Sequence, residues 1–480
     1  MNQKQKLLAV GGLAAAGTAV AYALNKTKPA TNGHRPPGPP LYPVIGMTRR
    51  LDMQQHEAVL HFQHEFGDFV HLQIVHKRLY LVSDPAGIKH VLQDNNHNYV
   101  KGLGLAKAKV FLGEGLLTNE GEPWRRQRRL IQPAFHRQKI SGFAETMTAV
   151  TSEMLAGWET AVAAQRPLNI AQEMMRLTLG IVAQTLFSTA LTPEEMDTVG
   201  RVMPHVLHVT NQRIQNVFAF WERLPTPANR RFMADLAALD RIVYRIIAER
   251  RETGGEQSDL LGMLMAARDE ETGAGMDDKQ LRDEVMTLFL AGHETTANLL
   301  AWTWYLLSLH PDVRARLQEE VDGVLNGRIP TSADVPNLTY TTQVLHEVLR
   351  LYPPAAIFSR TPLAADEVSG YAVEPGSVVI ISPYVMHRHP DYWQNPAGFQ
   401  PDRFAPGWER NLPRYVFIPF GGGPRLCIGN NFALMEAALI VAMVAQKYEL
   451  DLVPGHPVEA EFAVTLRPRY GVQMMLRRRG

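Results

Sequence analysis

The stretch FGGGPRLCIG, residues 420–429, contains Cys427, the single cysteine of this 480-residue chain. Three consecutive glycines and Arg425 precede this cysteine. Glycine adopts positive φ and lets the backbone approach a flat molecule closely. A thiol beside an arginine, just before a helix, has its thiolate stabilised by the helix dipole and by the charge. A buried cysteine that serves as a small hydrophobic side chain is the simpler alternative, but it leaves the glycines and the arginine unexplained. The stretch therefore predicts a shielded thiolate.

Composition limits the class of protein. The chain is 45% hydrophobic and 20% charged, with a formal net charge of +1, and this balance gives no reason to expect a nucleic-acid partner. One cysteine excludes an intramolecular disulfide, a thiolate-ligated zinc site and a cysteine-ligated iron–sulfur cluster. It also fits a reducing compartment. The chain is long enough to bury a large core.

The N-terminus has a different composition from the rest. Residues 7–24 read LLAVGGLAAAGTAVAYAL, an uncharged run between lysines at 4 and 6 and lysines at 26 and 28. As a helix this run would extend about 27 Å, barely the thickness of a bilayer core. A signal anchor is the favoured interpretation. A signal peptide cleaved near Ala21-Tyr22-Ala23 and a soluble helix are the alternatives.

We therefore divide the chain into an anchor or signal segment at residues 1–28, a proline-rich spacer at 29–45 and a single folded domain at 46–480. Proline fixes φ and removes a backbone donor, so the spacer is expected to be stiff and extended. With the anchor, the protein is membrane-associated through residues 7–24 and its folded domain lies in a reducing compartment. Without the anchor, the protein is expected to be cytoplasmic.

The order of elements predicts a mainly α fold with a small β-rich portion at one edge. Two strands are expected within residues 70–83, and mostly helical sequence follows up to Arg350. The clearest helix spans residues 278–309, with Asp277 or Asp278 as its cap and Pro311 at the start of the next helix. The remaining expected elements are a helix at 338–351, a strand at 378–385, an ordered loop at 387–415, a helix from 429 to 448 and a strand-like tail at 463–477.

Phe420, Gly423, Arg425, Cys427 and Gly429 have the spacing F-x-x-G-x-R-x-C-x-G, which resembles the haem-binding signature of the cytochrome P450 family. The resemblance implies a P450-like fold that holds haem b (iron protoporphyrin IX) between the long central helix and the cysteine loop. It implies that the Cys427 thiolate ligates the haem iron and that Phe420 and Gly423 contact the cofactor. It covers nearly the whole chain, and residues 46–480 then form a haem-thiolate catalytic domain.

Glu347 and Arg350 lie three positions apart in the helix expected at 338–351, so they share a helix face and can pair. An exposed pair that contributes little to stability is the simpler interpretation. By the resemblance, the segment PDRF at 401–404 supplies Arg403 as the third member of a Glu-Arg-Arg triad. The implied role of the triad is to hold the loop that carries Cys427, and breaking a buried pair would be costly.

The string AGHETT, residues 291–296, falls in the middle of the long helix. Glycine there costs about 1 kcal/mol relative to alanine, so helix propensity is not the reason for it. Small residues at 291 and 292 would leave room for a cofactor face. The string resembles the oxygen-activation motif of the family. This implies that Glu294 and Thr295 act as an acid–alcohol pair that orders water and passes protons to dioxygen.

Trp124 and Arg128 share a helix face at positions i and i+4. They resemble the W-x-x-x-R motif of the family, which implies that both bind a haem propionate, and the resemblance assigns Arg360 and Arg425 to the propionates as well. Arginine suits this role because it is permanently charged and binds carboxylates with two hydrogen bonds. The arginines at 125, 126 and 129 are expected to point outward, either as a docking patch for an acidic electron donor or as a solvated helix face.

Together these residues predict a haem-dependent monooxygenase that inserts one oxygen atom from O2 into a hydrophobic organic substrate such as a fatty acid, terpene or steroid. No flavin or iron–sulfur domain follows the tail, so the electrons are expected from a separate ferredoxin-, flavodoxin- or reductase-type protein. We expect a monomer. The expected pocket wall is largely apolar and consists of the helix at 286–295, the turn at 355–358, a loop at 103–117, the region 202–220 and the tail near 464–465.

Three alternatives stay open. A peroxygenase on the same fold would use hydrogen peroxide, although the intact Glu294-Thr295 pair favours O2. A non-catalytic haem sensor or carrier would bind the cofactor without turnover. A cysteine-nucleophile hydrolase would contain no haem.

Overall fold

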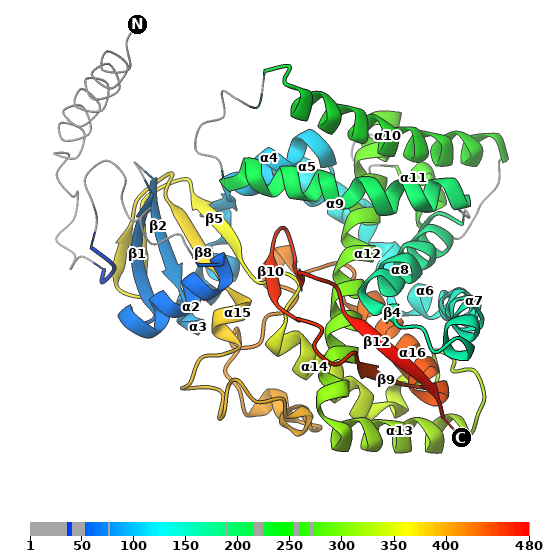
Figure 1. Ribbon diagram of the computed structural model, residues 1–480. Coiled ribbons are helices and arrows are strands. Elements are labelled where there is room, and N and C mark those ends of the chain that lie inside the picture. The colour runs from blue at the N-terminus through cyan, green and yellow to red at the C-terminus, as the bar shows by residue number, and fades with distance from the viewer. Residues whose placement is uncertain are drawn as a thin grey trace, which may run out of the picture.

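The computed structural model describes residues 36–40, 53–74, 77–188, 191–215, 222, 224–253, 259–268 and 273–479. The helices in this part are α2 (Gln55–Phe66), α3 (Pro85–Lys89), α4 (Leu103–Leu112), α5 (Gly121–Ile131), α6 (Arg137–Ser141), α7 (Ala144–Ala163), α8 (Ile170–Phe187), α9 (Pro193–Gln215), α10 (Pro227–Thr253), α11 (Leu260–Ala266), α12 (Asp278–Leu309), α13 (Pro311–Leu325), α14 (Thr339–Leu351), α15 (Pro383–Met386) and α16 (Asn430–Lys447). The strands are β1 (Phe69–Ile74), β2 (Lys77–Val82), β3 (Tyr99–Lys101), β4 (Leu168–Asn169), β5 (Phe358–Pro362), β6 (Asp366–Val368), β7 (Tyr371–Val373), β8 (Val378–Ile381), β9 (Tyr448–Leu452), β10 (Ala460–Phe462), β11 (Leu466–Pro468) and β12 (Gln473–Arg478). The prediction of a mainly α fold with small β-rich parts is confirmed (Figure 1).

Helix α12 runs through the centre of the helical part and has the bounds that the sequence predicts (Figure 1). The Asp277 carboxylate caps its start by accepting a hydrogen bond from the Gln280 backbone N–H at 2.7 Å, and Pro311 begins α13 just after its end. Its 32 residues extend about 48 Å. Helices α8, α10, α14 and α16 pack against it, and most of its side chains are buried. Within AGHETT, the side chains of His293, Glu294 and Thr296 are therefore buried.

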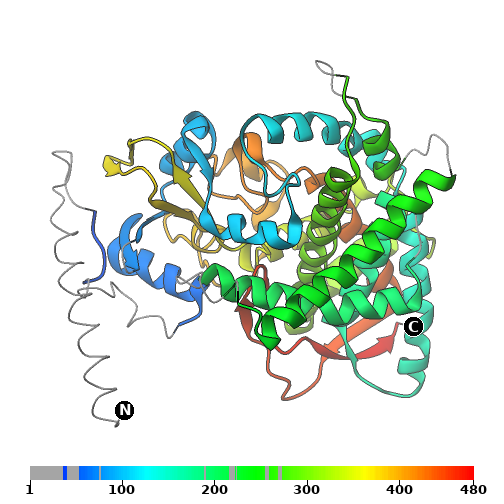
Figure 2. The ribbon, with the colours of Figure 1, turned by 90° about the horizontal axis from the view of Figure 1, so that it is seen from above.

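The strands of the described part form four separate sheets. The largest has the order β1-β2-β8-β5-β3 and lies with α2 to one side of the helices (Figures 1 and 2). The other sheets are β4-β12-β9, β10-β11 and β6-β7. The expectation of one β portion at one edge is therefore wrong. Strand β9 follows α16 directly, and β12 pairs with it antiparallel, so this part of the β structure lies among the helices.

Two local predictions also need correction. The strand expected at 378–385 ends at Ile381, because the Ser382 hydroxyl caps a new turn of helix by accepting from the Val385 N–H at 3.2 Å, with Pro383 at its first position. The expected loop at 103–117 begins with helix α4, which ends at Gly113, a glycine with a φ of 65°. The helices predicted at 338–351 and 429–448 are confirmed as α14 and α16.

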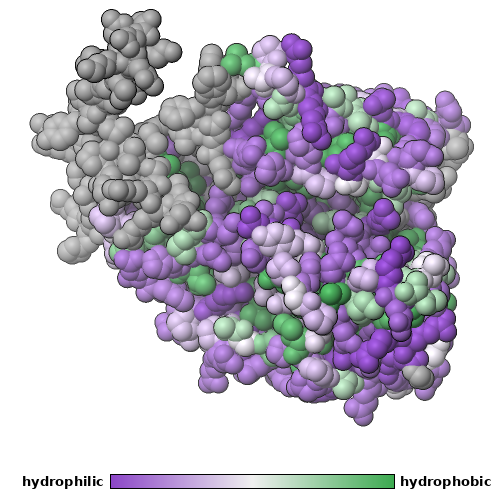
Figure 3. Space-filling model, viewed as in Figure 1, coloured by the Kyte–Doolittle hydropathy of each residue, from purple (hydrophilic) through white to green (hydrophobic). Residues whose placement is uncertain are grey.

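Two hydrophobic cores position the site. The larger is built from helices α7, α8, α12, α14 and α16, and within it the rings of Trp302 and Tyr352 stack at 4.0 Å. The smaller joins the five-stranded sheet to the segment 386–418, where Trp393 and Phe404 are buried. On the face drawn in Figure 3, hydrophobic residues are scattered among hydrophilic ones, which is normal for a folded surface. The loop that carries Cys427 follows the segment 386–418 and precedes α16, so it bridges the two cores.

The expectations for the N-terminus concern mostly residues outside the described part. The anchor or signal segment at 1–28, including the run 7–24, lies outside it, so its interpretation stays a prediction. Of the spacer, residues 36–40 are described. They have no regular secondary structure and lie against β1, where the Pro37 carbonyl accepts a hydrogen bond from the His71 N–H at 2.7 Å. Within the described ranges, no helix combines the length and the apolar composition that crossing a membrane requires.

Candidate active site

The loop around Cys427 is held by its own backbone. The Cys427 N–H donates to the Phe420 carbonyl at 3.0 Å, and the Gly421 N–H donates to the Ile418 carbonyl at 3.0 Å. Gly421 and Gly423 have φ values of 74° and 64°, a region that glycine adopts without strain. A Cβ at Gly423 would lie 1.8 Å from the Leu92 carbonyl oxygen. The glycines thus serve the folding of the loop and its packing against the segment that contains Leu92.

The Cys427 side chain has accessible surface. The protein atoms packed around its sulfur nevertheless desolvate the thiol and raise its pKa. A hydrogen bond from the Gly429 backbone N–H and the positive charge of Arg128 lower the pKa, but they do not outweigh the burial. The charge that lowers the pKa of the thiol is that of Arg128 rather than Arg425, so the expected neighbour is wrong, while the thiolate stays a prediction. The sulfur is accessible, and the protein around it favours the neutral thiol.

Glu347, Arg350 and Arg403 are brought together, as the sequence analysis expects. The side chains of Glu347 and Arg350 are 0% exposed and form two hydrogen bonds of 2.7 and 2.8 Å. The Nε of Arg403 lies 3.3 Å from Oε1 of Glu347. The simpler interpretation of an exposed surface pair is therefore wrong. A pair with no solvent contact must satisfy its polar atoms inside the protein, and these residues do so.

The remaining donors of Arg350 hold the segment that leads to the cysteine loop. Its guanidinium donates to the carbonyls of His387 at 2.9 Å, Pro396 at 2.7 Å and Gly398 at 2.8 Å. The buried His387 ring continues the connection, because its Nε2 accepts from the Ile418 N–H at 2.8 Å. Burial lowers the pKa of His387 to about 3, so the ring is neutral and can accept. A continuous chain of hydrogen bonds thus runs from α14 to the residues just before Phe420.

The predicted propionate residues lie near one another at the start of α5. The Arg425 guanidinium stacks on the Trp124 ring at 3.6 Å and forms an ion pair with Glu120. Arg128 donates to the Leu426 carbonyl at 2.8 Å, which ties α5 to the cysteine loop. Burial lowers the pKa of Arg360, and Glu120 is the charged group that opposes this. A basic site therefore forms between α5, β5 and the cysteine loop.

The same site contains Lys101, a residue that the sequence analysis missed. Its Nζ donates to the Leu116 carbonyl at 3.2 Å, and its backbone N–H donates to Glu120 at 2.7 Å. Burial, followed by the nearby charge of Arg425, lowers the pKa of Lys101 to about 7. Burial likewise lowers the pKa of Arg425 to about 10, and Arg360 and Arg128 add to the effect. These cations are desolvated and repel one another, so an anionic group would relieve both costs.

On α12 the small residues have different neighbours. Ala291 is exposed in the middle of a largely buried helix, whereas a Cβ at Gly292 would lie 2.9 Å from a methyl group of Val182 on α8. The expectation that both residues leave room for a cofactor is therefore wrong for Gly292, which allows α8 to approach α12. Ala291 is the residue that leaves an open face on the helix.

Glu294 and Thr295 point to different partners. The Thr295 hydroxyl donates to the Ala291 carbonyl at 2.7 Å, and this side chain is partly exposed. Glu294 is 3% exposed, and its Oε1 accepts from the Thr465 hydroxyl at 2.7 Å. Burial raises the pKa of Glu294. The alcohol thus lies on the open face of α12, and the acid lies on the neighbouring face, against the tail.

The expected pocket wall is apolar where the structure leaves it open. Ala291 on α12 and Ala355, just before β5, are exposed, and Ile357 and Phe358 are partly exposed. Val464 in the tail is also partly buried. Helix α4 replaces the expected loop at 103–117, and the region 202–220 begins within α9 and continues into residues outside the described part.

The three arginines expected to point outward from α5 behave differently from one another. Arg125 is exposed and lies 3.2 Å from Glu122, and Arg129 is exposed. Arg126 is half-buried, and its guanidinium donates to the Ala274 carbonyl at 3.1 Å. The outward direction is thus wrong for Arg126, which holds α5 against the chain before α12. Docking of an electron donor at the other two stays a prediction.

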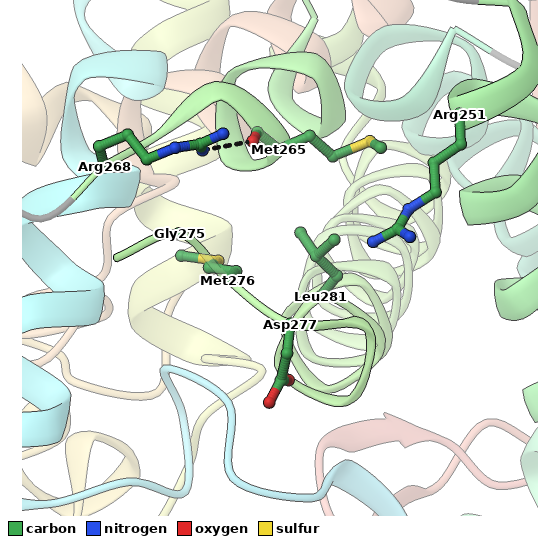
Figure 4. A pocket seen from close by; sticks show the side chains of 7 residues that line it. All are labelled: Arg251, Met265, Arg268, Gly275, Met276, Asp277 and Leu281. Atoms are coloured by element: carbon green, nitrogen blue, oxygen red, sulfur yellow. Dashed lines mark hydrogen bonds between the residues drawn. The ribbon is translucent and has the colours of Figure 1, made fainter. Parts of the chain in front are cut away.

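A separate cavity of about 370 Å³ lies where α10 and α11 meet the start of α12 (Figure 4). In Figure 4 the Arg268 guanidinium bonds the Met265 carbonyl, at 2.9 Å. Leu281, the lining residue nearest to Ala291 in sequence, lies about 15 Å away from it along the helix axis. The cavity shares no residue with the predicted site. It is lined by Arg251, Met265, Arg268, Gly275, Met276, Asp277 and Leu281.

Comparison with known proteins decides the family. The family model for cytochrome P450 matches residues 36–474. The chain belongs to the cytochrome P450 family. It is 40% identical over 390 residues to cyclooctatin synthase of Streptomyces melanosporofaciens, over 81% of this chain and 84% of the relative. It is 38% identical over 389 residues to cyclooctat-9-en-7-ol 5-monooxygenase of the same organism, again over 81% and 84%. Its fold resembles the crystal structure of the cytochrome P450DA heme domain with a TM-score of 0.84 and 28% identity, over 93% of this chain and 98% of that one.

This P450 is a monooxygenase with haem as its cofactor, as the sequence analysis predicts. The family implies an organic substrate, dioxygen and a redox partner. The residues of this chain fit haem. An accessible thiol at Cys427 offers a ligand for iron, the desolvated cations around Arg425 suit two carboxylates, and Ala291 leaves an open apolar face on α12.

Sequence reasoning missed Lys101 and His387, and it placed Thr465 on the pocket wall without finding its partner. Lys101 and His387 belong to no motif, and only the fold brings them to the site. Thr465 had a weak signal, because it is a polar residue in the otherwise apolar run AVTL of the tail. Its contact with Glu294 depends on a pairing of segments 171 positions apart, which no local pattern reports.

Replacing Glu347 with alanine should remove the carboxylate that accepts hydrogen bonds from both Arg350 and Arg403. We expect the free energy of unfolding to fall by about 3–5 kcal/mol, because Arg350 is left as an uncompensated buried charge. The purified variant should contain little haem, measured as haem absorbance per protein. Asp402→Ala is the matched control, since that carboxylate pairs with Arg316 at the surface and should cost about 0–1 kcal/mol. Equal haem content in both variants would contradict the structural role of the triad.

Alanine at Gly421 and alanine at Gly423 should differ in effect although both replace a glycine of positive φ. Nothing lies within 4 Å of a Cβ at Gly421. Backbone strain alone should therefore lower the free energy of unfolding of this variant, by about 1–2 kcal/mol. At Gly423 the Leu92 backbone must also move. We expect a lower thermal midpoint and lower haem content for Gly423→Ala than for Gly421→Ala. Identical midpoints would show that the close approach to Leu92 carries no weight.

Proposed function

We propose that this P450 oxidises a cyclic terpenoid hydrocarbon or alkenol. The proposal is supported by two relatives, one named for cyclooctatin synthesis and one for the 5-monooxygenation of cyclooctat-9-en-7-ol. The observation in this chain that carries it is the apolar character of the open residues around the site, Ala291, Ala355, Ile357 and Phe358. A rigid hydrocarbon skeleton can be bound by such surfaces at little cost in conformational entropy.

The haem is proposed to sit between α12 and the cysteine loop. Cys427 would ligate its iron, and ligation removes the thiol proton that the surrounding protein retains. Phe420 and Gly423 shape the loop on that side. The propionates would be held by Trp124 through its indole N–H, and by the basic residues Arg128, Arg360 and Arg425 through charge-assisted hydrogen bonds. When bound, the haem supplies the iron chemistry that activates dioxygen and inserts one oxygen atom into the substrate.

Glu347, Arg350 and Arg403 are proposed to be structural. Their support is the unbroken series of hydrogen bonds from α14 through His387 to Ile418, two residues before Phe420. A buried pair whose polar atoms are satisfied, as those of Glu347 and Arg350 are, is rigid, so it can keep the Cys427 loop in one conformation. Among the interactions of the described residues, Glu347, Arg350 and Arg403 make none with Ala291 or Thr295 on the open face of α12.

Glu294 and Thr295 are proposed to deliver protons during oxygen reduction. Thr295 lies on the open face and can hold a water by its hydroxyl. Glu294 is desolvated, so it keeps a proton to a higher pH than an ordinary carboxyl does and can serve as a proton source. Because the two side chains have separate partners, passage of a proton between them requires a water or a change of rotamer.

The substrate class is tested with two ligands of equal carbon number. Sclareol is a bicyclic terpenoid alcohol, and eicosanoic acid is a linear fatty acid. We expect sclareol to shift the haem absorbance at lower concentration and to yield a product that contains one atom from labelled ¹⁸O2, detected by mass spectrometry. Tighter binding and turnover of the fatty acid would contradict the proposed substrate class and leave the monooxygenase activity intact.

The proton-delivery pair is tested by removing one function at a time. Thr295→Val and Glu294→Gln should each lower the product formed per electron pair by an order of magnitude or more, with the electrons appearing as hydrogen peroxide. Thr295→Ser keeps the hydroxyl and should retain most of the coupling. The measurement is product and peroxide per donor oxidised, with haem content as the control for folding. Full coupling in Glu294→Gln would remove the acid from this role.

A further inference from the structure

The C-terminal tail is fastened to one face of α12 at three successive positions. Glu294 and Asn298 both bond the Thr465 hydroxyl, at 2.7 and 3.0 Å, and the Trp302 Nε1 donates to the Leu466 carbonyl at 3.2 Å. Positions 294, 298 and 302 are four residues apart, so they line one face of the helix. Strand β11 packs against α12 at this point. The tail therefore follows the face of α12 that is adjacent to its open face.

The hydroxyl of Thr465 has a fixed direction in this arrangement. The Asn298 amide N–H donates to its oxygen, so the Thr465 proton is free to point at Oε1 of Glu294. All three side chains are buried, with exposures of 3% for Glu294, 1% for Asn298 and 7% for Thr465. Solvent is thus not at hand to replace the hydrogen bond if the hydroxyl is removed.

We propose that Thr465 is the positioning residue of Glu294: its hydroxyl, oriented by Asn298, holds the carboxyl in place and stabilises the carboxylate that remains when Glu294 gives up its proton. The inference rests on the proton-delivery role proposed for Glu294. In the step concerned, the O–H bond of the carboxylic acid breaks, the proton passes to a water on the Thr295 side, and the negative charge stays on Glu294. The hydrogen bond from Thr465 is strongest to that charged form.

The surrounding charges leave Thr465 as the main group that favours the carboxylate. Burial raises the pKa of Glu294, the Thr465 hydrogen bond lowers it, and the charge of Arg467 in β11 lowers it less. The neighbouring His293 is neutral, because burial lowers its pKa to about 4. On the helices packed against α12, Glu347 of α14 pairs with Arg350, Asp240 of α10 pairs with Arg282, and Glu173 of α8 accepts from the Trp158 indole. Burial raises the pKa of Glu436 on α16 and lowers the pKa of His346 on α14 to about 4, so both favour the neutral form.

Loss of the Thr465 hydroxyl should raise the pKa of Glu294. Removing the Thr465 hydroxyl removes a group that favours the charged form, so the Glu294 carboxyl must hold its proton to a still higher pH. Serine at 465 keeps the donor and should keep the titration. A purely structural role for Thr465 would lower stability without moving the titration of Glu294.

The experiment compares Thr465→Val, Thr465→Ser and Thr303→Val as ferric holoproteins. Thr303 is the matched control, since it is a buried threonine of α12 whose hydroxyl bonds the Leu299 carbonyl away from the site. The first readout is the infrared C=O band of the protonated Glu294, identified by its loss in Glu294→Gln and followed against pH. We expect the band of Thr465→Val to change frequency and to persist to higher pH, with the other two variants like the parent protein.

The second readout is coupling, measured as peroxide released per donor oxidised with sclareol as the probe. Thr465→Val should lower product per electron pair about fivefold to tenfold, the effect of one lost hydrogen bond of ordinary strength. If Thr465→Val does not retain haem, Asn298→Leu tests the same point, because the hydroxyl then loses its orienting donor and the band should again persist to higher pH.

The outcomes separate this inference from the role of Glu294. An unchanged infrared titration in Thr465→Val, with Glu294→Gln uncoupled, overturns the inference and leaves the proposed function standing. Full coupling in Glu294→Gln overturns both, because Glu294 then has no proton-delivery role to support. A shifted titration that is rescued by Thr465→Ser and absent in Thr303→Val supports the inference.

Discussion

One buried ion pair, Glu347 with Arg350, connects α14 to the chain that leads to the proposed active site. Neither side chain contacts solvent, so each charge is tolerable only because the other is present and because backbone carbonyls satisfy the remaining donors of the arginine. Those carbonyls belong to the irregular segment after β8, and the same segment reaches the cysteine loop through His387. Irregular backbone is otherwise the least constrained part of a fold. Here a single guanidinium gives it the order that a metal ligand requires.

Helix α12 separates the tasks of the site by its faces. One face carries Ala291 and Thr295 and is open, the next is fastened to the tail by Glu294 and Asn298, and a third is held close to α8 by Gly292. A helix places successive residues about 100° apart, so an acid and an alcohol that are adjacent in sequence lie in different surroundings. This explains how Glu294 can be desolvated while its neighbour keeps access to the open side.

The sequence predicts regular elements and charge pairs better than it predicts long-range contacts. The bounds of α12 follow from a cap, a proline and periodicity, all of them local, and Glu347 with Arg350 is a spacing within one helix. Arg425 was expected beside the thiol, but stacking on Trp124 and the charge of Glu120 direct it elsewhere. Gly292 was read as room for a cofactor, whereas a neighbouring helix uses it. In both cases the deciding contact is made with a residue far away in the sequence, which the local pattern does not report.

The raised pKa of the thiol has a consequence for the stability of the whole site. Burial makes the Cys427 thiolate costly in the protein alone, and the crowded cations near Arg425 are costly for the same reason. A cofactor that brings an iron cation to the sulfur and two carboxylates to the cations offsets both costs at once. Binding that removes unfavourable terms from the folded state stabilises it by mass action. The lowered pKa values of the cations and the raised pKa of the thiol thus agree with the proposed positions of the propionates and the iron.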